Sequence, residues 1–385
     1  MRRINVTRLR EDLTVTAERD MNAGNIAGAA IAVIQSGTVL FHENFGYSNY
    51  LKRTPLNGGS IFRLASMTKP ITAVAALIGE EIGLYSLNDR VGDYFPKIAD
   101  MYVGKQENGA VIPHHKPREE LKLYHFLCHT SGFMSNSPLC TLQEANIPRS
   151  AFASNRAAIE YVMNNTCLTL EPTESTGYSA YQAFDVIGVL IEDKTGMKYA
   201  DFLKKYIFEP LGMTDTTYHP TEEQWSRMVM MSDRVAGGCR VNVDMGRHTF
   251  EGFPAEYTCA GAGLVGTLND YMKFAEMLRC EGYLGGKRIV SSAAIQRMRT
   301  PHVKPGAMKP GATDAWGLGV RVCNESHPDL APGTFGWSGA YGTHFFVDVE
   351  NDITAIYMKN SRWNDSAGCG KTGIVFQENV SNSLV

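Results

Sequence analysis

Two residues whose side chains could act together as nucleophile and base stand three positions apart in IFRLASMTKPITAVAALIGEEIGL, residues 61–84. Apolar residues recur there at steps of three and four, which predicts a helix that is buried on most sides and begins close to Ser66. On this helix Ser66 and Lys69 share one face. A desolvated lysine there can be uncharged and accept the serine proton. The alternative is that Ser66 only caps the helix and Lys69 extends to solvent.

A tyrosine in the stretch TGYSAY is the second candidate for proton transfer. Tyr178 precedes a helix that we expect to begin near Tyr181. A tyrosine held near a lysine can relay a proton to a leaving group. The alternative is a half-buried aromatic side chain at the entry of a helix.

A third candidate lies in FGWSGAYGTHFFVD, where small residues interrupt a strand pattern at Ser338-Gly339-Ala340. Such a run suggests that another molecule approaches the backbone closely, and an edge strand there could present an N–H group to a substrate carbonyl. The alternative is a β-bulge beside a structural Trp337.

Two further motifs are weaker on inspection. His125 and His129 are four apart in HFLCHTSGF, but the Glu of H-E-x-x-H and a third ligand are missing, so we expect no metal. The stretch DSAGCGKTG resembles a phosphate-binding loop, yet an acidic residue, Asp365, occupies the position that requires glycine. We therefore interpret Lys371-Thr372-Gly373 as the entry of a C-terminal helix.

Composition indicates a globular protein with a small-molecule partner. The 385 residues are 44% hydrophobic and 20% charged, and the net charge is -3. This charge offers no field that would attract nucleic acid or an anionic membrane. The N-terminal stretch has no apolar run of about 7 to 15 residues, and no later segment approaches about 18. These features predict a cytoplasmic location.

Strand patterns occur near both ends of the chain. Residues 29–50 predict a hairpin with a turn at Ser36-Gly37, and the last third has three strand segments, whereas about 120–225 is helical. Residues 104–119 (GKQENGAVIPHHKPRE) read as an exposed loop. We expect an α+β fold in one catalytic unit, 1–385, whose antiparallel sheet is built from both chain ends with flanking helices. About 1–70 and 230–385 would form the sheet region, and about 71–229 an inserted, mainly helical region.

Taken in order, Ser66-x-x-Lys69, Tyr178-Ser179-Ala180 and Trp337-Ser338-Gly339 resemble the motifs of the serine beta-lactamase and penicillin-binding-protein superfamily. The resemblance is to class C beta-lactamases and, most of all, to family VIII carboxylesterases. It extends from about residue 28 to 360 and includes the segments FRLASMTKP, HFLCHTSGF, IFEPLGMTDTTY, GAGLVGTLNDYMKFAEML and WSGAYGTHFFVD.

The resemblance implies a role for each motif. Ser66 would be the acylated nucleophile, Lys69 its activating partner, and Tyr178 the group that moves a proton to and from the leaving atom; which of the last two is the base stays open. The backbone N–H groups of Ser66 and Ala340 would form the oxyanion hole. No metal or organic cofactor is implied.

Two positions depart from the beta-lactamase pattern. Ala180 replaces an Asn that would hold the acylamino side chain of a lactam, and Trp337 replaces a Lys that would bind its carboxylate. Family VIII esterases share the Trp-x-Gly form. The expected function is therefore hydrolysis of small, short-chain acyl esters through an acyl-enzyme.

Alternatives of the same enzyme class are a weak cephalosporinase, a D-amino-acid amidase or peptidase, and an acyltransferase. A non-catalytic, penicillin-binding-like sensor is the alternative of another class. A non-catalytic binding pocket does not require Ser66, Lys69 and Tyr178 together, and their presence argues against the sensor.

Overall fold

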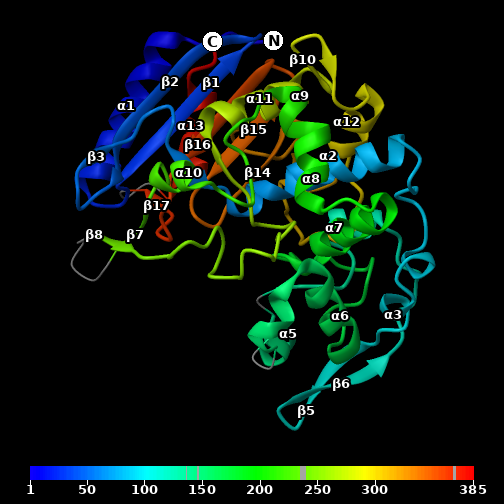
Figure 1. The fold of residues 1–385 in the computed structure, drawn as a ribbon. Helices are drawn as coiled ribbons and strands as arrows, with labels where there is room; N and C mark the ends of the chain where they lie inside the picture. The colour runs from blue at the N-terminus through cyan, green and yellow to red at the C-terminus, as the bar shows by residue number, and fades with distance from the viewer. Residues whose placement is uncertain (136, 145–146, 235–239, 367–369) are drawn as a thin grey trace.

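The structure is a computed structural model that describes the chain except residues 136, 145–146, 235–239 and 367–369. Its largest element is an eight-stranded antiparallel sheet built from both ends of the chain, which confirms the predicted α+β class (Figure 1). The strand order is β12-β13-β14-β15-β16-β1-β2-β3. The strands are β1 (Gly28–Gln35), β2 (Thr38–Asn49), β3 (Thr54–Pro55), β12 (Asp314–Trp316), β13 (Arg321–Cys323), β14 (Phe335–Ser338), β15 (His344–Asp348) and β16 (Ile353–Met358).

The predicted N-terminal hairpin forms because a tight turn separates two strand patterns. Ser36 and Gly37 both have positive φ, 50° and 75°, as a two-residue hairpin turn with the right twist requires. Every residue of β1 is buried, and β1 pairs with β16 on its other side. The first and last strands of this sheet in chain order are therefore neighbours within it.

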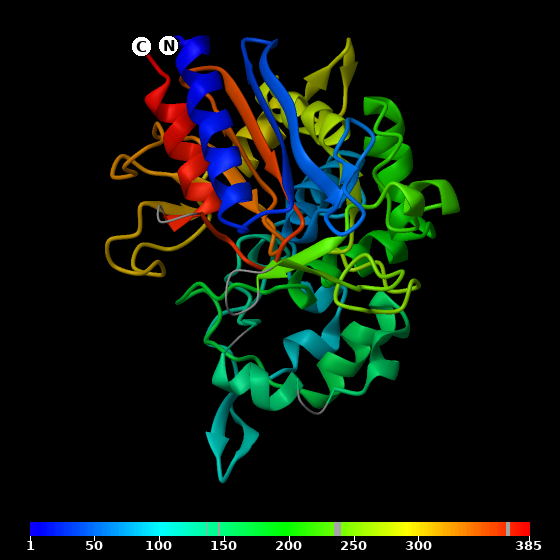
Figure 2. The same ribbon diagram turned by 90° about the vertical axis from the view of Figure 1, so that its left-hand side faces the viewer.

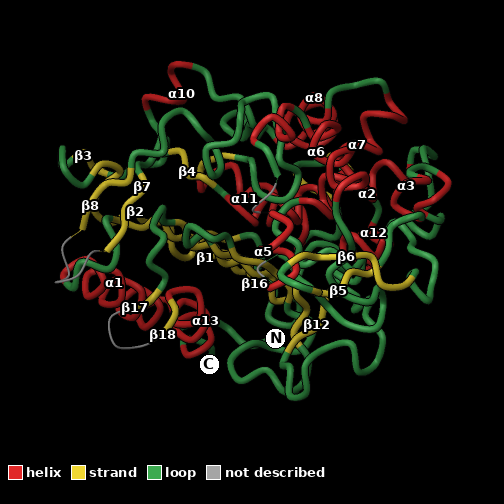
Figure 3. The backbone as a smooth tube through the Cα atoms, turned by 90° about the horizontal axis from the view of Figure 1, so that it is seen from below, coloured by secondary structure: helices red, strands yellow, loops and turns green. Residues whose placement is uncertain are grey.

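Helices cover both faces of the sheet. Helices α1 (Val6–Asn22) and α13 (Thr372–Asn382) lie side by side on one face, as Figure 2 shows, and pack on the alternate β1 residues Ala29, Ile31 and Val33. The other face of the sheet packs against α11 (Leu268–Arg279) (Figure 3). Side chains of this face, of α11, of α2 (Thr68–Glu81) and of α12 (Ser292–Met298) form one hydrophobic core. Lys371 is the N-cap of α13, so the Lys-Thr-Gly stretch is a helix entry, as predicted.

The middle of the chain is mainly helical, and its residues 96–165 lie beyond one end of the sheet (Figure 1). Gly196, with φ of 68°, ends its longest helix in the left-handed conformation. The elements are α3 (Pro96–Ala99), α4 (Tyr124–Leu127), α5 (Pro138–Glu144), α6 (Asn155–Asn165), α7 (Gln182–Thr195), α8 (Tyr199–Leu203), α9 (Glu209–Leu211) and α10 (Glu222–Ser226), with short turns η1 (Ala65–Met67), η2 (Val91–Asp93), η3 (Arg149–Ala153) and a π-helical η4 (Lys204–Phe208).

The prediction of a loop over residues 104–119 was wrong. Residues 103–115 form a projecting hairpin of β5 (Val103–Glu107) and β6 (Ala110–His115). Asn108 and Gly109 form its turn, with φ of 49° and 80°. The Asn-Gly pair is the strongest short-range sequence signal for a hairpin. Most residues of this hairpin are exposed, because it packs against little of the core, so the sequence shows no regular alternation of apolar and polar residues there.

Four short strand pairs complete the chain, and one of them leads into the predicted nucleophile. Strand β4 (Ile61–Arg63) pairs with β9 (Val265–Thr267) and runs directly into η1. The others are β7 (Met231–Arg234) with β8 (Arg240–Val243), β10 (Tyr283–Leu284) with β11 (Lys287–Arg288), and β17 (Asp365–Ser366) with β18 (Gly370–Lys371). In the described part of the chain, no helix has both the length and the apolar character needed to cross a bilayer.

Candidate active site

The structure brings Ser66, Lys69 and Tyr178 together. The Tyr178 hydroxyl donates to Ser66 Oγ at 2.5 Å, and Lys69 Nζ lies 3.3 Å from the same oxygen. Lys69 is fully buried and Ser66 is 8% exposed, while Tyr178 is half-buried. A hydroxyl in contact with both an amine and a phenol has two adjacent groups that can exchange its proton.

A strained turn presents Ser66. Ala65, the residue before it, has φ of 47°, a left-handed conformation that costs about 1 kcal/mol or more for a residue with a side chain. The turn η1 then passes into α2, whose residues up to Gly79 are buried. Ser66 therefore sits where strand β4 changes direction into a helix that is rigidly packed.

Two backbone carbonyls hold the Lys69 amine. Lys69 Nζ donates to Ala180 O at 2.6 Å and to Gly261 O at 2.8 Å, and its third contact is Ser66. The rings of Tyr178 and Phe184 lie 4.8 and 5.1 Å from the amine. A Cβ at Gly261 would lie 2.5 Å from Ala180 O, so only glycine lets both carbonyls approach the same amine.

His129 packs against the Tyr178 ring and binds the backbone of the next residue, Ser179. Its Nδ1 accepts the Ser179 N–H at 3.0 Å, and its ring lies 4.7 Å from the Tyr178 ring. Burial holds the pKa of His129 well below its usual value, so the ring is neutral and Nδ1 can accept. Ser135 N–H also donates to the Tyr178 carbonyl. The sequence offers His129 only as a possible metal ligand, because nothing in the motif HTSG indicates its contact with Ser179.

The third motif ends strand β14, which is not the edge strand we expected. It lies between β13 and β15 in the sheet. However, the pairing with β13 stops at Gly336, so Trp337 and the residues after it extend past the short neighbouring strand. Sequence cannot show this because it depends on the length of a partner strand.

Gly339 brings the end of β14 against the turn that carries Ser66. A Cβ at Gly339 would lie 2.3 Å from Leu64 O and 3.4 Å from the Ala65 Cβ. Thr343 Oγ1 donates to the same Leu64 carbonyl at 2.9 Å. Among the described residues, the N–H of the exposed Ala340 has no hydrogen-bond partner. This N–H is therefore available to a ligand.

Aromatic side chains line one side of the trio. The Trp337 ring lies 5.4 Å from the Tyr178 ring and 4.6 Å from the Trp316 ring. Ser338 is turned to a different partner, since its hydroxyl is 2.7 Å from Nδ1 of the buried His344. Trp337 thus offers an apolar surface where a lysine would offer a charge.

The described residues contain no group of three or more His, Cys, Asp or Glu side chains that could hold a metal ion. His125 is buried, its Nδ1 accepts the Lys122 N–H at 3.0 Å, and burial lowers its pKa to about 4. Its environment is that of a neutral structural imidazole.

Comparison with known proteins identifies the family. The family model described as Beta-lactamase matches residues 14–374. The chain belongs to the beta-lactamase family. This beta-lactamase-like chain is 23% identical over 377 residues to Esterase EstB of Burkholderia gladioli, covering 92% of this chain and 91% of EstB. It is 25% identical over 334 residues to a penicillin-binding protein of Bacillus subtilis (strain 168), covering 86% of this chain and 67% of that protein.

Solved structures show the same fold. A crystal structure of a family VIII carboxylesterase superimposes with a TM-score of 0.75 at 18% sequence identity, covering 98% of this chain and 97% of that one. The match to beta-lactamase-family relatives thus extends over almost the whole chain, including the segments that carry Ser66, Tyr178 and Trp337.

Proposed function

We propose that this protein is a serine hydrolase that cleaves small, short-chain acyl esters through an acyl-enzyme on Ser66. The observation that carries the proposal is the contact of one hydroxyl with two proton-transfer groups, Tyr178 at 2.5 Å and Lys69 at 3.3 Å. Membership of a hydrolase family and relatives named as esterases support it.

The proposed reaction has two halves. Ser66 Oγ attacks the ester carbonyl carbon while its proton passes to the Lys69–Tyr178 pair, and the N–H groups of Ser66 and Ala340 donate to the oxyanion. The carbon–oxygen bond of the ester then breaks, and Tyr178 returns the proton to the leaving alcohol. Water next attacks the acyl-enzyme and loses a proton to the same pair. The bond between the acyl carbon and Ser66 Oγ then breaks, the pair returns the proton to Ser66 Oγ, and the acid leaves.

The proposed substrate is neutral at its reacting end. Trp337 and Trp316 present aromatic surface beside Tyr178, and Ala180 has no amide that could hold an acylamino group. Binding a lactam carboxylate would favour a cation at position 337. An uncharged ester matches this surface better than a penicillin or cephalosporin does.

The test uses two chromogenic substrates, p-nitrophenyl butyrate and a chromogenic cephalosporin. We expect cleavage of the ester that disappears in Ser66→Ala, together with a mass increase at Ser66 after treatment with a serine-reactive phosphonate. Cephalosporin turnover without ester cleavage would assign a beta-lactamase instead. If the folded protein cleaves neither substrate, the result would favour the non-catalytic, penicillin-binding-like sensor.

A further inference from the structure

The backbone segment 257–261, which supplies a carbonyl to Lys69, is held by side chains at each successive residue. Most of these side chains are buried and come from distant parts of the chain. The contacts are Tyr257 Oη to Asp185 Oδ2, Asn155 Nδ2 to Thr258 O (2.6 Å), Tyr218 Oη to Cys259 O (3.2 Å), Ala260 N to Asp185 Oδ1 (2.8 Å), Thr72 Oγ1 to Ala260 O (2.6 Å) and Lys69 Nζ to Gly261 O (2.8 Å).

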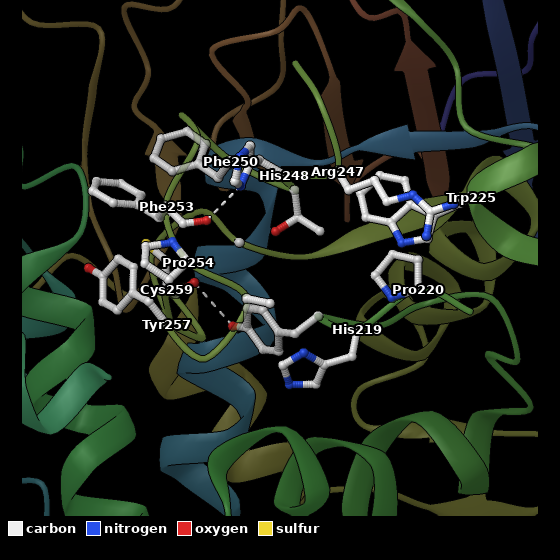
Figure 4. A pocket seen from close by; sticks show the side chains of 14 residues that line it. His219, Pro220, Trp225, Arg247, His248, Phe250, Phe253, Pro254, Tyr257 and Cys259 are labelled. Atoms are coloured by element: carbon white, nitrogen blue, oxygen red, sulfur yellow. Dashed lines mark hydrogen bonds between the residues drawn. The ribbon is translucent and has the colours of Figure 1, made fainter. Parts of the chain in front are cut away.

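On its outer side the segment borders a pocket as well as a small apolar cluster, to which Tyr257 and Cys259 belong. A pocket of about 260 Å³ lies there, and Tyr257 and Cys259 line it together with aromatic residues. Figure 4 shows Phe250, Phe253 and Tyr257 on one side of the pocket and Pro220 and Trp225 on the other. Hydrogen bonds to buried side chains therefore act together with this apolar packing to define where the segment lies.

Asp185 contacts this segment at two points. Its two carboxylate oxygens accept from the Tyr257 hydroxyl and from the Ala260 N–H, and Ala260 is covalently joined to Gly261. Asp185 is fully buried in the first turn of α7, where the positive end of the helix favours a carboxylate. The residue Ala180, which supplies the other carbonyl to Lys69, lies directly before Tyr181, the N-cap of this helix. The start of α7 therefore sets both carbonyls around the amine.

The charge of Lys69 also acts on Asp185. Burial raises the pKa of Asp185 to about 7, while its two donors and the positive charge of Lys69 lower it. The other titratable groups that face Asp185 are Tyr199 on α8 and Tyr218, Tyr257 and Cys259 from the loops. Both contacts of Asp185 come from donors, so the ionised carboxylate is the form that satisfies them.

We propose that Asp185 is a positioning residue of the active site, which holds segment 257–261 so that Gly261 O fixes the Lys69 amine beside Ser66. This inference rests on the proposed function of Lys69. It predicts that loss of the carboxylate lets the segment move and misplaces the amine, without removing any group that touches the substrate.

The test compares Asp185→Asn, which keeps the shape of the side chain, with the matched control Asp193→Asn. Asp193 is an exposed carboxylate of the same helix that pairs with Arg156. We expect Asp185→Asn to lower kcat for p-nitrophenyl butyrate about 100-fold, as misplacement of a reacting group does, with KM nearly unchanged. Asp193→Asn should keep the wild-type kcat.

Two further readouts separate positioning from a general structural role. Hydrogen exchange should rise in peptides that cover 257–262 and stay unchanged in the central strands β1 and β16. The wild-type kcat profile should fall below a pH of about 7, where Asp185 gains a proton, and Asp185→Asn should lose this decline. A normal kcat with unchanged exchange in 257–262 would overturn the inference.

Tyr257→Phe covers the case in which Asp185→Asn does not fold. It removes one of the two donors and keeps the ring, so we expect a smaller loss of kcat, about tenfold, with faster exchange in 257–262. Wild-type values for both would overturn the inference. If the wild type cleaves no ester, the proposed function fails, but the rate at which a phosphonate labels Ser66 still reports on Lys69. An unchanged labelling rate in both variants would then overturn the positioning role.

Discussion

The Tyr178 phenol oxygen lies 2.5 Å from Ser66 Oγ although 112 residues separate the two in the chain. Ser66 lies in the turn that leads into the buried helix α2, and Tyr178 lies in the stretch before α7, which approaches this turn. The Lys69 amine lies between the two segments because it contacts Ser66 on one side and the carbonyl of Ala180 on the other.

Tyr178→Phe removes only this hydroxyl. We expect kcat for p-nitrophenyl butyrate to fall by about 10² to 10⁴, the usual contribution of a proton-transfer group, with the fold retained. Steady-state kinetics measures kcat, and circular dichroism shows whether the fold is retained. The control is Tyr283→Phe, an exposed tyrosine that should behave as wild type. A wild-type kcat in Tyr178→Phe would leave Lys69 as the group that transfers the proton alone.

Gly339→Ala should damage the active site by misplacing Ala340. The new Cβ would lie 2.1 Å from Thr343 Oγ1 and 2.3 Å from Leu64 O, so the strand end must move away from the Ser66 turn. We expect a loss of stability of roughly 1–3 kcal/mol, typical of overpacking, and a larger relative loss of kcat. Thermal unfolding and kinetics test this. Gly59→Ala, where the nearest atom would be 3.4 Å away, is the matched control.

Trp337→Lys should change which substrate is preferred. The ammonium would attract a lactam carboxylate with roughly 1.5–3 kcal/mol of charge-assisted hydrogen bonding, while the aromatic contacts with Tyr178 and Trp316 would be lost. We expect the ratio of kcat/KM for cephalosporin over ester to rise by about tenfold or more. Trp337→Phe, which keeps an aromatic ring, should leave the ratio close to wild type.

The stability of the wild type should depend on the charge of Asp185. Its pKa in the folded protein is raised to about 7, so the folded protein retains a proton that the unfolded chain has already lost at lower pH. The free energy of unfolding should therefore fall as the pH rises from about 4 to 7, relative to Asp185→Asn. Urea unfolding of both proteins across this range measures the difference. Parallel curves would contradict the raised pKa.

His344 should produce the opposite dependence. It is buried between Ser338 and Gln377, and burial lowers its pKa to about 4. Below a pH of about 6.5 the unfolded chain gains a proton that the folded protein does not accept. The wild type should lose stability as the pH falls from 6.5 to 4, and His344→Gln should lose less. Urea unfolding at pH 5 and pH 8 gives this comparison.

Local sequence patterns predicted the elements that depend on neighbouring residues. The Ser36-Gly37 turn defined the first hairpin, and steps of three and four apolar residues placed the helix that begins close to Ser66. The hairpin at Asn108-Gly109 was missed because few apolar residues flank its turn. Patterns of this kind succeed where one face of an element is buried, since burial imposes the period.

Residues far apart in the chain and without a common motif were not predicted from sequence. Asp185, Gly261 and His129 each contact segments that position Ser66, Lys69 or Tyr178. His129 and Gly261 lie in segments that the family resemblance singled out, but the pattern did not reveal their contacts, and Asp185 lies in no such segment. Similarly, the small residues after Trp337 led us to expect an edge strand, whereas β14 has the short, three-residue strand β13 beside it in the sheet.

By itself, the sequence determined the types of reactive groups, their order along the chain and the replacement of a lysine by Trp337, because these are properties of single residues and short spacings. Only the tertiary structure decided that two carbonyls enclose the Lys69 amine, that Ala340 N–H is left without a partner in the described chain, and that a buried Asp185 holds the segment before Gly261. The physical reason is that hydrogen bonding and burial act between atoms brought together by packing, whatever their separation along the chain.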